Sequence, residues 1–536
     1  MKNTASFDQS SSRSLVDIVA KHADSVLERC RDRYGSKETP LFTDGIYLKT
    51  GEPGKWEDYV VSNLACQQNF LRTLDGLTTM TEEPKYREIA HEWISYALNE
   101  LQDSESGMLY WGGHTNYDLI DNKPLLGNHE LKCVYPYYSF LYSVDPKATS
   151  FHIEGFWNKH VKDWSSLLFN RHGEYNEWDR ANPWGHDYTG GALPIVDNSM
   201  LSFINTGSDL IYAGAILAKS SGRNEPLQWA ERLIRRYDEV RNETTGLGGY
   251  QFNHREPCRV RISFKKPWSD RPEVNETTVI RSGVIQTRYG RAALTFLNLF
   301  EELGADGQAF LDVTSKDLVA IGEHAYDFSD HSFFSVLNNG ERLYPSNCIE
   351  GAGYCSPRSL NNVPASGMAF LVYAKAYRIT GNEFFWRMAR NLGQGIGFGE
   401  VFDATDDKSP ELRSNLPENL EIPLNQPGRI GSCRNHVCTL LGIMELYKAT
   451  GQKDYLTLAK NLGSQMVHDY FADGFLTTGE EGSRGFTSID SYLPLGLLHL
   501  AAVAEGKDVA LPTFYPNVTT FDPKVVISRR KRTQRS

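Results

Sequence analysis

The sequence lacks any apolar run of about 18 residues, which is the length that a membrane-spanning helix needs. Its first residues, MKNTASFDQSSSRSLVDIVAKHADSV, also lack the apolar stretch of about 7 to 15 residues that follows a basic start in a secretory leader. These two absences predict a cytoplasmic protein that has no membrane partner.

Basic residues are fewer than acidic ones, with 56 Lys and Arg against 67 Asp and Glu and a formal net charge of −11. An acidic surface argues against nucleic acid as a partner. A locally basic cleft can still bind an acidic ligand, because local fields steer ligands. The final stretch, ISRRKRTQRS, is a basic tail that we assign to residues 526–536 and expect to be disordered.

Cysteine is scarce, with eight residues scattered over 536 positions. Without a leader, this pattern favours free thiols in a reducing compartment over a disulfide framework. Cys433 and Cys438, with His436 between them, are a candidate zinc half-site, but no second cysteine pair of similar spacing completes it.

An internal repeat gives the strongest indication of the fold. The segments YRITGNEFFWRMARNLGQG (377–395) and YKATGQKDYLTLAKNLGSQ (447–465) share a Thr-Gly turn followed by an apolar-periodic helix. Weaker copies occupy 77–95, 218–236 and 300–322. Each copy predicts one helix ending at the turn and a second helix beginning after it.

The two helices of each predicted hairpin differ in character. The helix before the turn is small and apolar, as in GMAFLVYAKAY (367–377), and suits an inner ring. The helix after the turn is amphipathic, with Phe385, Met388, Ala389 and Leu392 on one face, and suits an outer ring. Five or more such hairpins indicate an all-α toroid or barrel, with a solenoid stack as the alternative.

Residues 240–291 depart from this helical pattern. TTGLGGYQFNHREP and CRVRISFKK alternate like strands, and a Pro-rich segment follows. Between 255 and 291, seven Arg and two Lys face four acids, a local net charge of +5. We expect a β-hairpin or extended lid inserted into one catalytic domain that spans 1–525. Its positive charge either belongs to an ordinary solvated loop or forms a basic wall that binds an acidic substrate.

Three segments combine His with Gly, Asn and aromatic residues: GMLYWGGHTNYD (107–118), GNHELKCVYPYY (127–138) and FNRHGEYNEW (169–178). His114, Glu130 and His172 can supply two nitrogens and one oxygen to a divalent ion. Such a set suits Mn²⁺, Co²⁺, Ni²⁺ or Zn²⁺ better than Ca²⁺. His129 and His186 are rival ligands, and the sequence does not rank them.

The WGGH segment, the HELK segment and the Arg171-His172 pair occur in an order that resembles polysaccharide lyase family 2, the pectate lyases with an (α/α)7 barrel. The resemblance implies a divalent metal, expected to be Mn²⁺ with Co²⁺ or Ni²⁺ as alternatives, on His114, Glu130 and His172. It also implies Arg171 as the Brønsted base, and pectate or oligogalacturonates as the substrate. The alternative role of Arg171 is an ordinary ion pair with Glu174 or Asp179.

The implied reaction removes the C5 proton of a galacturonate unit, which is α to a carboxylate. Arg171 is an unusual base because a guanidinium normally stays protonated. We predict that further Arg, Lys and aromatic side chains bind the uronate chain, since guanidinium groups pair with carboxylates and rings stack on sugars. The candidates are Lys132, Trp178, Arg180, Trp184, Arg288 and Arg291.

Two other functions fit a helical toroid. A glycoside hydrolase or sugar epimerase is the first, because fold alone does not choose the reaction. A hydrolase needs two carboxylates across the cleft, and four residues are available: Glu174, Glu177, Asp179 and Asp187. A non-catalytic carbohydrate-binding toroid is the second.

Overall fold

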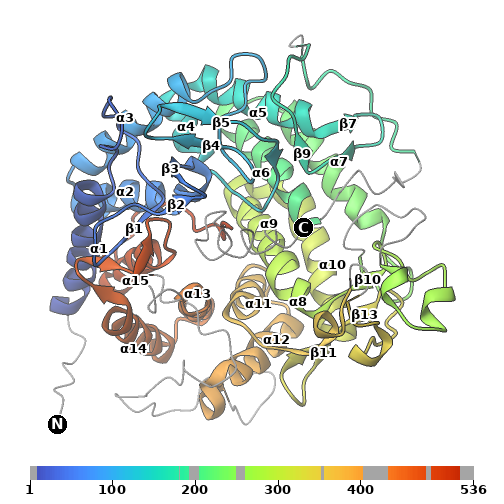
Figure 1. The fold of residues 1–536 in the computed structure, drawn as a ribbon. Helices are drawn as coiled ribbons and strands as arrows, with labels where there is room; N and C mark the ends of the chain where they lie inside the picture. Colours follow the sequence, from blue (N-terminus) through green and yellow to red (C-terminus); the bar gives the residue numbers. More distant parts are fainter. Residues whose placement is uncertain are drawn as a thin grey trace.

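The computed structural model describes residues 9–179, 182–191, 204–248, 260–351, 355–402, 433–477 and 485–518. In Figure 1 the helices follow one another around a ring in chain order, so that the first and last helices lie side by side. Within the described residues, no helix is long and apolar enough to cross a membrane.

Seven pairs of an inner and an outer helix build the ring in the part of the chain that the structure describes; six are hairpins of consecutive helices, and the seventh pairs α15 with α1. The inner helices are α2 (Gln68–Thr81), α4 (Tyr138–Val144), α6 (Ile204–Ser221), α9 (Gly290–Leu303), α11 (Gly367–Thr380), α13 (Cys433–Thr450) and α15 (Leu493–Glu505). Their outer partners are α3 (Lys85–Glu100), α5 (Pro146–His160), α7 (Glu225–Glu239), α10 (Gln308–His324), α12 (Glu383–Gly393), α14 (Lys453–Tyr470) and α1 (Gln9–Arg29).

The ring closes because α15 packs against both α1 and α2. Between α2 and α4, the Tyr137 hydroxyl donates to Asp75 at 2.8 Å, and the Tyr137 backbone N–H donates to Gln68 at 2.7 Å. The remaining neighbours from α4 to α15 contact one another directly. These contacts confirm the predicted (α/α)7 barrel and exclude an open solenoid stack.

Glycines with a left-handed backbone conformation follow the inner helices α11 and α13 at the turns that the repeat predicts. Gly381 and Gly451 follow α11 and α13 with φ of 67° and 70°. A Cβ at either position would meet no atom within 4 Å, so the backbone conformation, and not crowding, favours glycine there. The two strongest copies of the repeat therefore mark real hairpin turns.

Burial separates the two rings as predicted. Helix α11 packs between α9 and α13 and buries most of its residues. Helix α12 buries one face only, which contains the predicted Phe385, Met388, Ala389 and Leu392. Inner helices are thus apolar because neighbours surround them on nearly all sides.

Short strands between the helices form seven small sheets among the described residues. The pairs are β1 (Gly45–Tyr47) with β17 (Phe486–Ser488), β6 (His129–Glu130) with β9 (His172–Gly173), β7 (Val161–Asp163) with β8 (Leu168–Phe169), β10 (Val279–Ile280) with β13 (Val336–Leu337), and β15 (Phe471–Ala472) with β16 (Phe475–Leu476). A four-stranded sheet has the order β2 (Lys55–Trp56), β3 (Tyr59–Ser62), β4 (Asn116–Asp118), β5 (Lys123–Leu125), and a three-stranded sheet has the order β11 (Tyr326–Asp327), β12 (Ser332–Phe333), β14 (Val363–Pro364).

The insertion at 240–291 differs from the predicted hairpin where it is described. Arg261–Ser263 and Trp268–Asp270 are 3-10 turns, and β10 pairs with the later strand β13 instead of a neighbour inside the insertion. The alternating apolar residues Val260 and Phe264 instead pack in a small separate core with residues of 337–360. The single-domain assignment of 1–525 stays a prediction, and the tail at 526–536 lies outside the described residues.

The predicted basic wall is partly neutralised. Arg271 contacts Glu341 at 2.6 Å and Glu273 at 2.7 Å, and Lys266 lies 3.5 Å from Asp270. The described part of this segment therefore carries less uncompensated charge than its composition indicates.

The described cysteines are buried thiols and not disulfides, as the lack of a disulfide framework predicts; Cys258 lies outside the described residues. The candidate zinc half-site is not assembled, since His436 Nδ1 lies 2.6 Å from the Tyr470 hydroxyl. Burial raises the pKa of the Cys438 thiol to about 12, which disfavours the thiolate that binds metals.

The segment that follows α15 crosses the ring and ties distant helices together. The Phe514 carbonyl accepts a hydrogen bond from Asn298 of α9 at 2.8 Å, and the Tyr515 hydroxyl donates to Glu302 at 2.8 Å. The Val518 N–H donates to the Cys133 carbonyl at 3.0 Å. The last described residues thus reach the loop that precedes α4.

His22 of α1 gives a test of ring closure. Its Nδ1 accepts the N–H of Leu476 at 3.1 Å, and burial lowers its pKa to about 3. As pH falls below about 6.5, this histidine takes up a proton in the unfolded chain but stays neutral in the folded protein. The stability that neutral His22 contributes is therefore present above that pH and is lost below it. This site should lose about 2 kcal/mol of unfolding free energy between pH 8 and pH 5.

His22→Asn keeps an acceptor for Leu476 but cannot titrate. Urea unfolding at both pH values should show the variant less stable than wild type at pH 8, with the difference smaller at pH 5. Parallel pH dependences in the two proteins would contradict the assignment of a neutral His22.

Candidate active site

Two short antiparallel strands bring distant segments of the sequence together. In the pairing of β6 with β9, Glu130 lies directly opposite His172, so both side chains point to the same face. The pairing continues beyond the strands, because the Leu131 N–H donates to the Arg171 carbonyl at 2.9 Å. The Asn170 side chain also accepts the His172 N–H at 2.9 Å, which fixes the start of β9.

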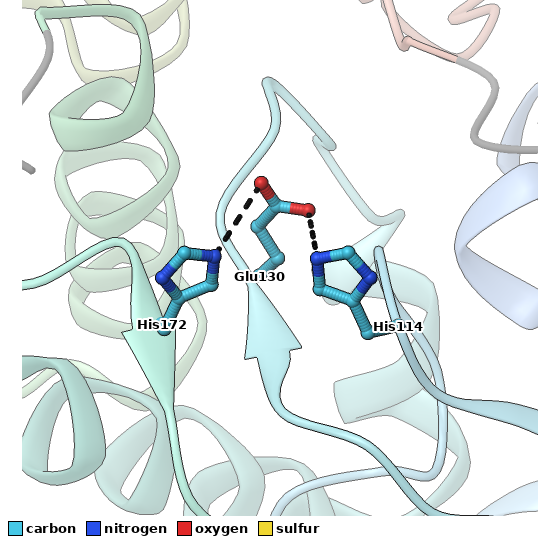
Figure 2. A group of neighbouring side chains, drawn as sticks. All are labelled: His114, Glu130 and His172. Carbon is cyan, nitrogen blue, oxygen red and sulfur yellow. Dashed lines mark ion pairs between the residues drawn. The ribbon is translucent and has the colours of Figure 1, made fainter. Parts of the chain in front are cut away.

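His114 reaches the same face from the loop before β4. Figure 2 shows Glu130 between the two imidazoles, with one carboxylate oxygen toward each ring. The His114 Nε2 lies 3.1 Å from Oε2 of Glu130, and the His172 Nε2 lies 3.7 Å from Oε1. The three residues therefore form one cluster from three segments of the chain.

The glycines of the WGGH segment allow this approach. A Cβ on Gly113 would lie 2.4 Å from Oε2 and 2.8 Å from Cβ of Glu130, distances that no real contact has. Gly112 has φ of 104°, a conformation that other residues rarely adopt. The loop can lie against Glu130 only because both positions lack a side chain.

Asn63 holds the His114 loop, and the sequence analysis did not identify it. Its buried Nδ2 donates to the Gly112 carbonyl at 3.0 Å and to Asn116 Oδ1 at 2.8 Å. Its Oδ1 accepts the Gly112 N–H at 3.2 Å. One amide thus binds the loop on both sides of His114. No pattern in the sequence signals it, since it lies about 50 residues earlier.

Two cationic side chains contact the same carboxylate. Lys132 Nζ lies 2.5 Å from Oε2 of Glu130, and Arg171 Nε lies 3.4 Å from Oε1. Burial by itself raises the pKa of the Glu130 carboxyl. The two neighbouring imidazoles and the charge of Lys132 outweigh burial and hold this pKa well below its usual range. Glu130 is therefore ionised at neutral pH.

The spacing of the cluster fits a divalent ion. One ligand atom from each of His114, Glu130 and His172 lies within 4.8 Å of the other two. An ion with bonds of about 2.0–2.2 Å holds neighbouring ligand atoms about 3 to 4 Å apart. Two imidazoles and one carboxylate leave further coordination positions open, as in catalytic metal sites.

The rival ligands lie elsewhere. His129 is buried, with its Nδ1 2.9 Å from the Nε2 of His160. His186 is exposed and stacks on Trp164, with ring centroids 4.6 Å apart. Neither belongs to the cluster within the described residues.

His160, at the end of α5, connects the barrel to the site and was also missed. Its Nδ1 lies 2.8 Å from the Asn170 carbonyl, which only accepts, so His160 donates there and accepts from His129 through Nε2. Burial lowers the pKa of both rings, to about 3 for His129, so both are neutral. This chain fixes β6 and β9 relative to α5.

The other predicted substrate-binding residues divide into three groups. Trp184 packs among Trp157, Trp164 and Trp229 with 4% of its surface exposed, so it belongs to the core and cannot stack on a sugar. Half-buried Trp178 donates to the Ser106 carbonyl at 3.1 Å and stacks on Phe151. Arg180 and the side chain of Arg288 lie outside the described residues, and Arg291 lies on inner helix α9.

The carboxylates considered for hydrolysis are exposed on the segment after β9. They are Glu174, Glu177, Asp179 and Asp187. None of them belongs to the cluster around Glu130 in the described part of the chain.

Comparison with known proteins identifies the family. A family model described as periplasmic pectate lyase matches residues 39–523. A pectate disaccharide-lyase of Dickeya dadantii (strain 3937) is 33% identical over 379 residues, which cover 64% of this chain and 68% of that protein.

Solved structures give weaker similarities. A sugar epimerase from a ruminal bacterium is 14% identical with a TM-score of 0.45, over 72% of this chain and 86% of that chain. A family 76 glycoside hydrolase from a bovine Bacteroides thetaiotaomicron strain is 12% identical with a TM-score of 0.44, over 92% of this chain and 77% of that chain. At these values neither bears on the reaction.

The family description also contradicts the prediction of a cytoplasmic protein, which is wrong. That prediction depended on a missing leader, and the first residues of a sequence are a poor guide to the compartment. The match itself spans most of the chain, so the protein belongs to the family described as periplasmic pectate lyase and is a polysaccharide lyase.

Proposed function

We propose that the protein cleaves 4-linked galacturonan or short oligogalacturonates by metal-assisted β-elimination, with Arg171 as the base. The observation that carries this proposal is the Glu130 carboxylate between two imidazoles, with Arg171 immediately before His172 at the start of β9. In β-elimination the C5 proton moves to the base, a C4=C5 double bond forms, and the C4–O bond breaks. The leaving oxygen then takes a proton from solvent.

His114, Glu130 and His172 would hold the metal, for which we propose Mn²⁺, with Co²⁺ or Ni²⁺ as alternatives. When bound, a divalent ion neutralises the uronate carboxylate and so acidifies the C5 proton. The side chains support this role: Glu130 is ionised, and the His114 and His172 Nε2 atoms both face it.

Arg171 is the proposed base because it lies beside this cluster, with Nε 3.4 Å from Glu130. Its backbone is held by the Leu131 N–H, so the side chain extends from a fixed strand. A guanidinium rarely loses its proton.

For substrate binding we propose Lys132 as the first partner of a uronate carboxylate. Its side chain is 35% exposed and extends from the segment after β6 to the cluster. We keep Trp178, Arg180 and Arg288 as candidates for further subsites.

The first test is the product. Protein stripped with a chelator should release no product from polygalacturonate, and adding Mn²⁺ should restore the ultraviolet absorbance of the unsaturated uronate. New reducing ends without that absorbance would indicate hydrolysis and contradict the proposal.

Arg171→Ala tests the base. We expect kcat on trigalacturonate to fall about 10²- to 10⁴-fold, the range for losing a general base. Bound Mn²⁺, measured by elemental analysis, should stay near the wild-type level because the three ligands remain. Arg31→Ala, which removes an exposed ion pair with Glu92, is the control. Near-normal turnover in Arg171→Ala would remove Arg171 from the chemistry.

Gly113→Ala tests the metal ligands without changing them. The added Cβ overlaps both Oε2 and Cβ of Glu130, so the carboxylate must move away from His114. We expect Mn²⁺ affinity, measured by calorimetry, to fall about 10- to 100-fold, as for changes that displace metal ligands. Gly283→Ala is the matched control, because its Cβ meets only one atom, at 4.0 Å. Equal affinity in both variants would argue against a metal at this cluster.

A further inference from the structure

Lys132 contacts the carboxylate of the proposed metal ligand Glu130. Its Nζ lies 2.5 Å from Oε2 of Glu130, and the His114 Nε2 lies 3.1 Å from the same oxygen. Lys132 follows Glu130 by two positions, where the chain bends just after β6, and its ammonium turns back to the carboxylate. The ammonium and the proposed metal therefore share one carboxylate oxygen.

The burial of Glu130 explains why a cation lies there. Only 3% of its side chain is exposed, and an ionised carboxylate in such a place needs a nearby positive charge. Lys132 supplies that charge without a metal. When a divalent ion takes this role, the ammonium is left beside a second cation.

The repulsion between the two cations is large enough to measure. A divalent ion and an ammonium about 4 Å apart repel by an amount that corresponds to about tenfold or more in affinity, even at the dielectric constant of water. The flexible four-carbon stem of lysine lets the charge move away from the ion. Lys132 is 35% exposed, so its ammonium can turn toward the solvent side, where an acidic sugar arrives.

We propose that Lys132 is a resident cation that competes with the metal for Glu130 and, once displaced, pairs with a uronate carboxylate of the substrate. This inference rests on the proposed function. The metal frees Lys132 to bind the acidic sugar, and the sugar draws Lys132 away from Glu130. Each ligand therefore raises the affinity for the other, and the two effects are equal. Metal affinity is then low in the sugar-free protein and rises when the acidic chain is bound.

Lys132→Met tests the competition, because methionine keeps most of the stem and loses the charge. Mn²⁺ titration of the sugar-free protein by calorimetry should give about tenfold tighter binding than wild type. Lys132→Arg keeps the cation and should not tighten binding. Lys123→Met removes a lysine that pairs with Asp121 on the surface and should change nothing. Unchanged or weaker Mn²⁺ binding in Lys132→Met would overturn the proposal, and a purely structural role predicts weaker binding.

The second arm tests the coupling to sugar. In wild type, the Mn²⁺ concentration for half-maximal initial rate should fall as trigalacturonate rises from low to saturating levels. In Lys132→Met this shift should be smaller, because only the direct attraction between the metal and the uronate remains, while KM for trigalacturonate rises and kcat changes less. If the half-maximal Mn²⁺ concentration shifts as much in Lys132→Met as in wild type, the proposed coupling is wrong.

The two proposals can fail separately. If wild type forms no unsaturated product with any metal, β-elimination fails, while the sugar-free Mn²⁺ titration still decides the role of Lys132. If product forms normally and Lys132→Met does not tighten Mn²⁺ binding, only the competition fails.

Discussion

The charge of Glu130 is the constraint on which the rest of the site depends. A carboxylate that is almost fully buried stays ionised only when donors and cations surround it. Four side chains from three segments of the chain surround it here: His114, Lys132, Arg171 and His172. The same negative charge that requires these neighbours makes the cluster suitable for a divalent ion.

The barrel supplies the rigidity that such a cluster needs. Its inner helices are covered on most sides and its outer helices pack through one face, while the site is built on strands of two residues and on loops. His160 extends from the last turn of α5 and fixes both β6 and β9 through hydrogen bonds. Asn63 does the same for the His114 loop from the start of the first hairpin. Weak local elements are thus held by side chains anchored in strong ones.

The hairpins could be predicted from the sequence because each is a local pattern: a turn with Gly, then apolar residues at helical spacing. The metal cluster could be proposed because three His-bearing segments follow the order of the lyase family, whereas the residue types alone did not rank His129 and His186 below the ligands. Pairing of β6 with β9 could not be predicted, since two-residue strands carry no periodic signal. Trp184 looked like a sugar-binding ring because composition does not distinguish a buried ring from an exposed one. The strand-like alternation around Phe264 formed a satellite core instead.

Closure of the ring between α1 and α15 also sets an order for folding. Hairpins whose partners are neighbours in the chain can form early, whereas contacts between segments hundreds of residues apart form slowly. Helix α1 therefore stays without its main partner until the last hairpin has been synthesised. Val518 binds the Cys133 carbonyl, next to Lys132, so this contact to the loop beside Glu130 forms only at that final stage. A nascent chain thus carries every proposed metal ligand long before the ring around them closes.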